Sequence, residues 1–366
     1  MKLVTNRETL LKAASLVSQA ITTRLSLPVL GNLLLEANSG MLKITGTNLE
    51  TTIIKQMSVK IEENGETTVP ARLLVDFCQA ATNEQLTIKT VKDSVLLESG
   101  DSKATLSTIN PSEFPKVTTF ESASTLELER QTFLNTVSSV IFCAAAEEGR
   151  PVLTGILIKG SASKLVFVAT DGYRLGKNEI TGSGDFEVLI PSRALQETVK
   201  AVADQEDETV QLSVDKEKNQ AKIETRNLII ISRLLEGAYP SFEQIIPTAF
   251  CSTVTVSTKA LVNAVKLGAL FARDVGNVVK IELGAGKLKL TGATSQVGDA
   301  ETEMHANIDG EKMTLAFNSR FLLESLSAIK DEQMTMSLSG STSAAIFRGR
   351  DKKNLSFVIM PVRPQS

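Results

Sequence analysis

The chain has 366 residues, of which 39 are basic, 42 are acidic and 42% are hydrophobic. This length exceeds one ordinary domain and suits three domains of about 120 residues each. The formal net charge of −3 by itself disfavours a protein that binds nucleic acid.

Reactive side chains are scarce, which argues against several kinds of site. The single histidine, His305, argues against histidine-based metal or triad chemistry. The three cysteines, Cys78, Cys143 and Cys251, are far apart and odd in number. This pattern favours buried thiols in a reducing compartment over a disulfide framework or a zinc site. We predict no catalytic residues, no metal and no cofactor.

Export and membrane signals are also missing from the sequence. Asn6, Arg7 and Glu8 interrupt any apolar core of a signal peptide. No uncharged apolar run approaches the roughly 18 residues that a membrane span needs. We therefore expect a cytoplasmic protein with no membrane contact.

Helical and strand patterns alternate along the chain. Apolar residues recur at three- and four-residue steps over 10–21, 133–144 and 261–268, and each run predicts a helix that opens a repeat. Alternating runs such as 51–63 and 209–215 predict strands. Each third of the chain thus has the order helix, strands, helix, strands. This order predicts an α+β fold in which two helices cover one face of antiparallel sheets.

The strand patterns recur with a long period. Leu42, Leu165 and Leu288 are spaced 123 residues apart, and a polar segment follows each of their strands: GTNLET at 46–51, ATDGYR at 169–174 and GATSQV at 292–297. Solenoid repeats have periods of only about 20 to 50 residues. The period therefore predicts three copies of one domain, which we place at 1–122, 123–249 and 250–366. Phe114-Pro115, Tyr239-Pro240 and Met360-Pro361 resemble one corner used three times.

A second recurring segment predicts a helix start. VPAR at 69–72, IPSR at 190–193 and FNSR at 317–320 each lead from a strand pattern into a helical one. Proline suits a helix start because its missing N–H would be unpaired there, and serine or asparagine can cap the helix. Arg72, Arg193 and Arg320 should therefore occupy equivalent first-turn positions.

Charge is distributed unevenly over these elements. The six predicted helices, at 6–21, 71–83, 130–146, 191–203, 257–273 and 318–330, carry eleven basic and four acidic residues. If the helices share one face, that face is positive while the sheets are acidic, and it would attract phosphate. The alternative is that these lysines and arginines are ordinary surface charges on solvent-exposed helix faces.

Motifs of the strong catalytic kinds do not occur. The sequence holds no phosphate-binding glycine loop, CxxC pair, HExxH or GxSxG. GAGKLKL at 284–290 predicts a hairpin turn. Asp171 precedes a glycine and favours a turn over a catalytic acid. A hydrolase using Asp171 with Glu147 or Glu148 remains the enzyme alternative, and assays of phosphoester turnover would detect it.

Four segments carry a family resemblance over essentially the whole chain. GRPVLTG at 149–155, VATDGYRL at 168–175, AYPSFEQIIP at 238–247 and VIMPVR at 358–363 resemble, in order and spacing, the bacterial DNA polymerase III beta subunit family of sliding clamps. The resemblance implies a head-to-tail homodimer that closes into a ring around duplex DNA and gives the polymerase processivity without catalysis. It also implies partners: the DNA polymerase III alpha subunit, the clamp loader, and other proteins with a clamp-binding motif, namely translesion polymerases, ligase and mismatch repair proteins.

The resemblance also implies site residues. Arg24 and Arg72 would face DNA, and the helix pattern extends this set to Arg193, Lys200, Lys266 and Arg320. Leu270 and Phe271 would form the apolar contact of the ring interface. The peptide-binding cleft would comprise Leu153, Thr170, Gly172, Tyr173, Arg174, Leu175, Pro240, Ile245, Val358, Met360, Pro361, Val362 and Arg363.

Two alternatives and three departures qualify this assignment. The cleft residues could be ordinary core residues at strand ends, and the chain could be a scaffold that binds no DNA. Tyr173 stands where the family often has histidine and Gln244 where arginine is common, so the cleft rim is less basic. Pro364-Gln365-Ser366 extends past the usual end and could cover the cleft mouth or hang free.

Overall fold

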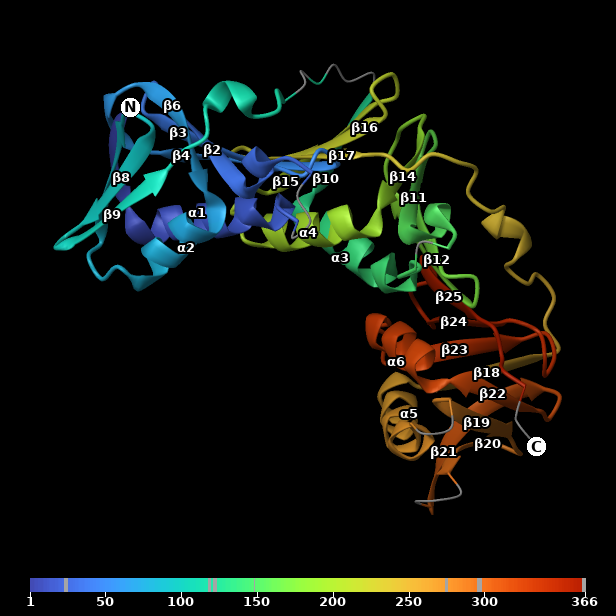
Figure 1. Cartoon of the computed structure of the whole chain (residues 1–366). Helices are drawn as coiled ribbons and strands as arrows, with labels where there is room; N and C mark the ends of the chain where they lie inside the picture. The colour runs from blue at the N-terminus through green and yellow to red at the C-terminus, as the bar shows by residue number, and fades with distance from the viewer. Residues whose placement is uncertain are drawn as a thin grey trace. The chain divides into compact units, whose positions relative to one another are not determined.

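The computed structural model describes residues 1–22, 26–117, 120, 124–147, 149–273, 276–294 and 298–363, which fall into two compact units. The first compact unit is Met1–Leu134 with Arg193–Leu234, and the second is Asn135–Ser192 with Leu235–Ser366. Arg24, Glu148 and the tail at 364–366 lie outside the described residues. The chain can be followed by colour in Figure 1.

The first compact unit holds two antiparallel sheets. Their strand orders are β5-β1-β7-β8-β9 and β10-β15-β16-β17-β4-β3-β2-β6. Helices α1 and α2 pack against each other, and α1 also packs on β3 and β4. The strands are β1 (Lys2–Asn6), β2 (Asn32–Asn38), β3 (Met41–Thr47), β4 (Thr51–Ser58), β5 (Lys60–Glu63), β6 (Gly65–Pro70), β7 (Gln85–Val91), β8 (Ser94–Ser99), β9 (Ser102–Ser107), β10 (Ser124–Glu129), β15 (Thr209–Asp215), β16 (Gln220–Glu224) and β17 (Leu228–Arg233). The helices are α1 (Arg7–Val17), α2 (Ala71–Ala80), the first part of α3 (Arg130–Val140), α4 (Ser192–Ala203) from Arg193 onward, and the 3₁₀ helices η1 (Ser18–Ala20), η2 (Pro28–Gly31) and η3 (Pro111–Glu113).

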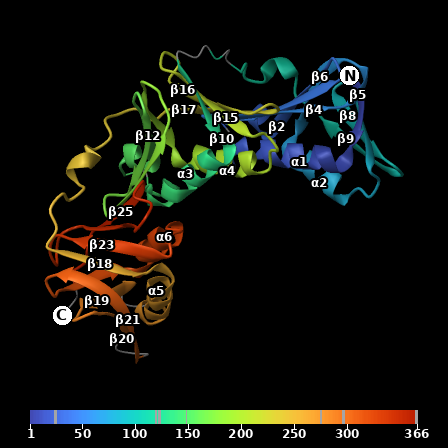
Figure 2. The ribbon, with the colours of Figure 1, turned by 180° about the vertical axis from the view of Figure 1, so that it is seen from behind.

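The second compact unit is built on one long sheet of order β14-β11-β12-β13-β25-β24-β23-β18-β21-β20-β19-β22. Helices α5 and α6 pack together, and α5 rests on β20 and β21; both views show the two helices on one side of these strands (Figures 1 and 2). The strands are β11 (Gly155–Gly160), β12 (Lys164–Thr170), β13 (Arg174–Thr181), β14 (Glu187–Pro191), β18 (Ser252–Ser257), β19 (Val278–Leu283), β20 (Lys287–Thr294), β21 (Gly298–Gly310), β22 (Thr314–Asn318), β23 (Gln333–Leu338), β24 (Ala345–Gly349) and β25 (Leu355–Ile359). The helices are α5 (Thr258–Ala272), α6 (Ser319–Ala328) and the 3₁₀ helices η4 (Ile141–Cys143), η5 (Pro151–Thr154) and η6 (Phe242–Gln244).

The predicted three-fold repeat is present in the element order. Leu42, Leu165 and Leu288 lie on β3, β12 and β20 and are fully buried. Within the described residues, each repeat has a strand, a helix, three strands, a fourth strand, a second helix and three more strands, with β5 added in the first. The fold is therefore the predicted α+β repeat with two α-helices in each copy. The boundaries at 122 and 249 stay a prediction.

One detail of the expected order was wrong. Each repeat opens with a strand rather than a helix: β1, β10 and β18 precede α1, α3 and α5. The alternating residues that carry these strands, as in STVTVS at 252–257, are few, and the stronger helical period beside them masked the signal. These short strands pair with β7, β15 and β23, so the register comes from partners distant in the sequence.

The three predicted helix starts are confirmed. Helices α2, α4 and α6 follow β6, β14 and β22 directly, and Arg72, Arg193 and Arg320 are each the second residue of their helix. Asn318 caps α6, since its Oδ1 accepts hydrogen bonds from the N–H groups of Arg320 and Phe321 at 2.9 and 3.4 Å. At α2 the residue before the helix is Pro70, which makes no side-chain capping bond. The three segments therefore share a strand that leads directly into a helix with arginine as its second residue.

Candidate peptide cleft and basic helix starts

A tight turn between β12 and β13 forms one wall of the site. Asp171 Oδ1 accepts hydrogen bonds from the N–H groups of Tyr173 and Arg174, both at 2.9 Å. Thr170 Oγ1 accepts one from the Gly172 N–H at 3.1 Å and donates to the Arg174 carbonyl at 2.6 Å. Gly172 supplies the left-handed backbone angle, with φ of 92°. The predicted turn at Asp171 is confirmed.

The chain end closes on this turn. The Met360 N–H, just after β25, donates to the Tyr173 carbonyl at 2.9 Å. β25 pairs with β13, with Val358 opposite Leu175. The turn and the end of β25 are thereby fixed to each other by backbone hydrogen bonds.

These elements enclose a cleft of about 210 Å³ within the second compact unit. Ten of the thirteen predicted cleft residues line it. They are Leu153, Thr170, Gly172, Tyr173, Arg174, Leu175, Pro240, Ile245, Val358 and Met360.

The floor of the cleft belongs to the hydrophobic core. Leu175 and Val358 are almost completely buried and pack in one cluster with Val168, Phe242 and Ile346. The alternative that the cleft residues are ordinary core residues is therefore correct for the floor. It does not exclude a binding site, because the rim of the cleft is open. Tyr173 is 68% exposed, and Ile245 and Met360 are exposed large apolar side chains. A packed apolar floor under an exposed apolar rim suits an apolar ligand.

Three predicted members lie away from this lining. Pro361, Val362 and Arg363 do not line the cleft. The Val362 N–H donates to the carbonyl of Ala316 on β22 at 2.8 Å. Arg150, which also lines the cleft, was missed. It lies inside the GRPVLTG segment, so the signal was present but was assigned only to Leu153. Gln244 does not contribute to the lining either.

The predicted equivalence of Met360-Pro361 with the corner at Tyr239-Pro240 is wrong. The Met360 N–H donates to the Tyr173 carbonyl, and the Val362 N–H donates to the Ala316 carbonyl. In the preceding repeat, the Arg233 N–H donates to the Glu50 carbonyl in the same way as Met360, and the Leu235 N–H donates to the Leu189 carbonyl in the same way as Val362. The chain end at Met360-Pro361 therefore corresponds to Arg233-Leu234 and not to Tyr239-Pro240. A shared aromatic-proline or methionine-proline pair is too short a pattern to establish the alignment.

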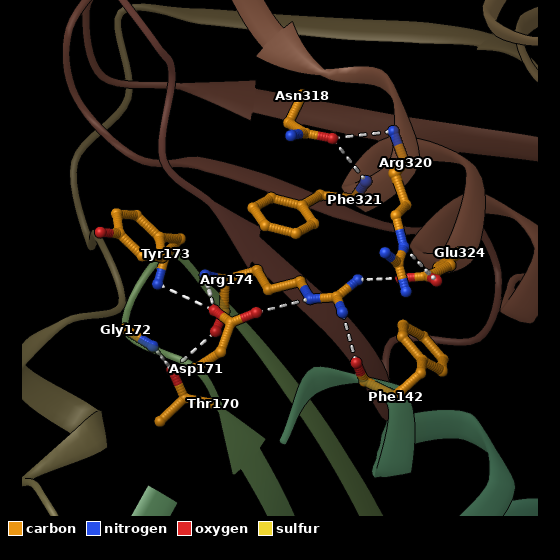
Figure 3. Close-up of polar contacts among 10 residues, drawn as sticks. All are labelled: Phe142, Thr170, Asp171, Gly172, Tyr173, Arg174, Asn318, Arg320, Phe321 and Glu324. Atoms are coloured by element: carbon orange, nitrogen blue, oxygen red, sulfur yellow. Dashed lines mark hydrogen bonds and ion pairs between the residues drawn. The ribbon is translucent and has the colours of Figure 1, made fainter. Parts of the chain in front are cut away.

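Arg174 does not project into the cleft as a free cation. Its side chain is only 6% exposed, and its Nε donates to Asp171 Oδ2 at 3.0 Å. Its Nη1 donates to Glu324 Oε2 and its Nη2 to the Phe142 carbonyl, as Figure 3 shows. The guanidinium also lies over the Phe321 ring, 4.5 Å from the centroid, and over Phe142 at 5.5 Å. Arg174 thus stabilises the turn that forms one wall of the cleft, through its bond to Asp171.

Each of the three helix-start arginines pairs with a carboxylate one turn later. The Nε atoms of Arg72, Arg193 and Arg320 lie 3.7, 3.3 and 3.2 Å from carboxylate oxygens at the fourth following residue. Those partners are Asp76, Glu197 and Glu324. All three arginine side chains remain mostly exposed. The repeated carboxylate orients each guanidinium and leaves its outer N–H groups toward solvent.

The remaining predicted contact residues lie on helices α4 and α5. Lys200 on α4 and Lys266 on α5 are exposed, as is Leu270 near the end of α5, while Phe271 is half-buried. Within the described residues, no group of three His, Cys, Asp or Glu side chains could hold a metal ion. No described helix is long and apolar enough to cross a membrane.

Comparison with known protein families accounts for all three repeats. The chain matches the N-terminal domain of the DNA polymerase III beta subunit over residues 1–118, its central domain over 127–241 and its C-terminal domain over 243–363. The chain belongs to the DNA polymerase III beta subunit family. As a member of this family it is a DNA sliding clamp.

Individual relatives agree along the full length. The chain is 33% identical to the beta sliding clamp of Synechocystis, with 99% of each chain covered, and 30% identical to that of Pseudomonas putida, with 99% and 100% covered. A crystal structure of the Pseudomonas aeruginosa DNA polymerase III subunit beta superposes with a TM-score of 0.93 at 27% identity, covering 99% of this chain and 100% of that one. The beta subunit fold therefore extends through the cleft and the three helix starts.

Proposed function

We propose that two copies of this chain close into a ring around duplex DNA, slide on it without reading its sequence, and tether the replicative polymerase through the cleft. The ring has no catalysis of its own and acts in the cytoplasm. Leu270 and Phe271 contribute the apolar contact between protomers.

The observation that carries the proposal is the helix start that occurs three times, each with an exposed arginine at its second position. Guanidinium groups bind phosphate oxygens well, and contacts to phosphate position DNA without specifying sequence. Arg72, Arg193 and Arg320, with Lys200 and Lys266, are the proposed DNA-facing cations, which attract duplex DNA through charge alone. Arg24 belongs to the same proposed set.

The cleft supplies the tether. Its apolar floor is already packed, so a short peptide with apolar side chains can enter without much reorganisation. Exposed Met360 at the rim can adapt to different side chains. The proposed occupants are peptide segments of the DNA polymerase III alpha subunit, the clamp loader, translesion polymerases, ligase and mismatch repair proteins.

Retention on DNA tests the proposal directly. The protein is loaded onto nicked circular plasmid with its clamp loader, the complex is isolated, and the plasmid is then cut once. We expect the protein to stay on the circle and to leave after linearisation, because enclosure retains it more strongly than its phosphate contacts do. A plasmid without the cutting site, treated with the same enzyme, is the control. Retention on the linear product, with release only by salt, would refute the ring.

A further inference from the structure

The Glu324 carboxylate lies between two arginines that the proposed function assigns to different ligands. Its Oε2 accepts from Nη1 of Arg174, behind the cleft, and its Oε1 accepts from Nε of Arg320, at the start of α6, at 3.2 Å. Figure 3 shows the interactions of both arginines with the Glu324 carboxylate as dashed lines. Glu324 is 31% exposed, Arg174 is 6% exposed and Arg320 is 75% exposed. The carboxylate therefore bridges a buried cation and a solvated one.

The two bonds differ in strength because of this burial. The pair with Arg320 is a solvent-exposed contact between residues one helical turn apart, which is weak and screened by salt. The pair with Arg174 lies where less water competes, and the guanidinium is also held by Asp171 and two aromatic rings. An anion can thus take Arg320 away from Glu324 far more easily than it can take Arg174.

Arg174 connects Glu324 to the turn that lines the cleft. Its Nε bonds to Asp171 Oδ2, and Oδ1 of the same carboxylate orders the backbone N–H groups of Tyr173 and Arg174. Those residues line the cleft together with Gly172. A tighter hold on Arg174 therefore stabilises the turn that a peptide contacts.

The other two repeats lack this link. Asp76 and Glu197 pair with Arg72 and Arg193 in the same helical geometry, but within the described chain neither carboxylate accepts from a second arginine. The turn of the first repeat has Thr51 where the second has Arg174, so it has no side chain to reach across. The bridge thus occurs between the second and third repeats, which together line the cleft.

We propose that Glu324 is a positioning residue that couples Arg320 to the cleft. When a DNA phosphate holds Arg320, the Glu324 carboxylate is left to Arg174 alone, the turn at Asp171–Arg174 is reinforced, and peptides bind more tightly. The inference rests on the proposed function, since it assumes DNA at Arg320 and a peptide in the cleft. By reciprocity, an occupied cleft also favours the DNA contact.

The test measures peptide affinity by fluorescence anisotropy, first without DNA. The probe is a short fluorescein-labelled peptide of the DNA polymerase III alpha subunit, selected for binding to the wild-type protein. We expect Arg320→Ala to tighten binding about twofold and Glu324→Gln to weaken it about fivefold. In the Glu324→Gln background, Arg320→Ala should have no further effect. Arg193→Ala removes the matching arginine of α4, and peptide affinity should stay unchanged.

A second arm tests the DNA link itself. Wild-type clamps loaded on nicked circles should bind the peptide about twofold more tightly than free clamps, and Arg320→Ala clamps should show no difference. Equal effects of Arg320→Ala and Arg193→Ala, or tighter binding on DNA that persists in Arg320→Ala, would overturn the coupling while leaving the clamp function intact. If no alpha-subunit peptide binds the wild-type protein, the tethering proposal itself fails. Thermal unfolding of each variant checks that the chain remains folded.

Discussion

Leu49 and Gly172 adopt the same left-handed backbone conformation at corresponding positions of two turns, with φ of 77° and 92°. In each turn the N–H of this residue donates to a threonine Oγ1 at 3.1 Å, from Leu49 to Thr47 and from Gly172 to Thr170. Asn48 accepts from the next two N–H groups as Asp171 does. The polar side chains therefore impose the turn, and glycine only removes its strain.

Substitution of Gly172 by alanine should destabilise the protein through the backbone alone. No atom lies within 4 Å of an added Cβ, so the expected loss of about 1 kcal/mol in the free energy of unfolding comes from the left-handed φ. Urea denaturation measures it. Gly286→Ala, with φ of 73° and equally open space, should lose a similar amount, whereas Gly149→Ala, in open space without a left-handed φ, should not. Equal behaviour of all three variants would contradict the backbone argument.

Removal of Arg174 should cost far more than removal of Arg320, although both contact Glu324. Arg174→Met leaves Asp171 and Glu324 without their shared buried cation, and breaking such a pair costs about 3 kcal/mol. Arg320→Met removes an exposed pair worth less than about 1 kcal/mol. The midpoints of urea unfolding compare the two variants directly. If Arg320→Met lost as much free energy of unfolding as Arg174→Met, exposure would not determine what each ion pair contributes to stability.

Local signals made part of this molecule predictable. In the three repeated segments a strand leads directly into a helix with arginine as its second residue. Asn318, Asp171 and Thr170 all bond to N–H groups within three positions along the chain. The buried Leu42, Leu165 and Leu288 follow from the period of the repeat. These features can be predicted without knowing which residues distant in the sequence pack against them.

Contacts between distant residues were not predictable in the same way. Glu324 bonds to Arg174 across 150 positions, and no pattern near either residue indicates the partner. The family resemblance placed Arg174 in the cleft, but its burial behind the wall depends on where Phe142 and Phe321 pack. Likewise, the Val362 N–H bonds to the carbonyl of Ala316, which is distant in the sequence.

The helix-start arginines should contribute to DNA binding through charge. Each DNA phosphate that is no longer neutralised by an arginine should reduce the slope of log affinity against log salt by about 0.9. Arg72→Ala, Arg193→Ala and Arg320→Ala are combined, and affinity for duplex DNA is measured by anisotropy over a range of salt. Lys353→Ala, at an exposed position between β24 and β25, is the control and should leave the slope unchanged. An unchanged slope in the triple variant would show that these arginines do not neutralise DNA phosphates. Absence of any DNA binding by the wild-type protein would instead favour a scaffold that binds no DNA.

The three thiols should differ in reactivity. Burial raises the pKa of the Cys78 thiol to about 11 and also raises that of Cys143, so neither forms much thiolate near pH 8. Cys251 is only half-buried, although its thiol donates to the Leu338 carbonyl at 3.4 Å. Titration with a disulfide reagent should detect at most one fast thiol per folded chain, which Cys251→Ser removes, and all three after denaturation. Fast reaction of a second thiol in the folded chain would contradict the burial.

Stability should depend on pH through Glu197. Burial raises the pKa of its carboxyl, while Arg193 and Lys200 oppose the rise. A folded pKa above the unfolded value means that ionisation costs stability. The cost is absent below the ordinary glutamate pKa of about 4.3 and complete once the pH exceeds the raised pKa. Glu197→Gln has no such cost, so its stability relative to wild type should increase as the pH rises from about 4 to about 7.

Urea denaturation at several pH values measures this difference. Asp76→Asn is the matched reference, because Asp76 occupies the same position relative to Arg72 but is mostly exposed. Glu197→Gln also loses the ion pair with Arg193 at 3.3 Å. Above the pKa of Glu197, this loss lowers the free energy of unfolding of the variant by a roughly constant, small amount. The slope with pH, and not the offset, therefore reports the burial. A difference that stays flat or falls as the pH rises would show that Arg193 and Lys200 outweigh the loss of solvent around this carboxylate.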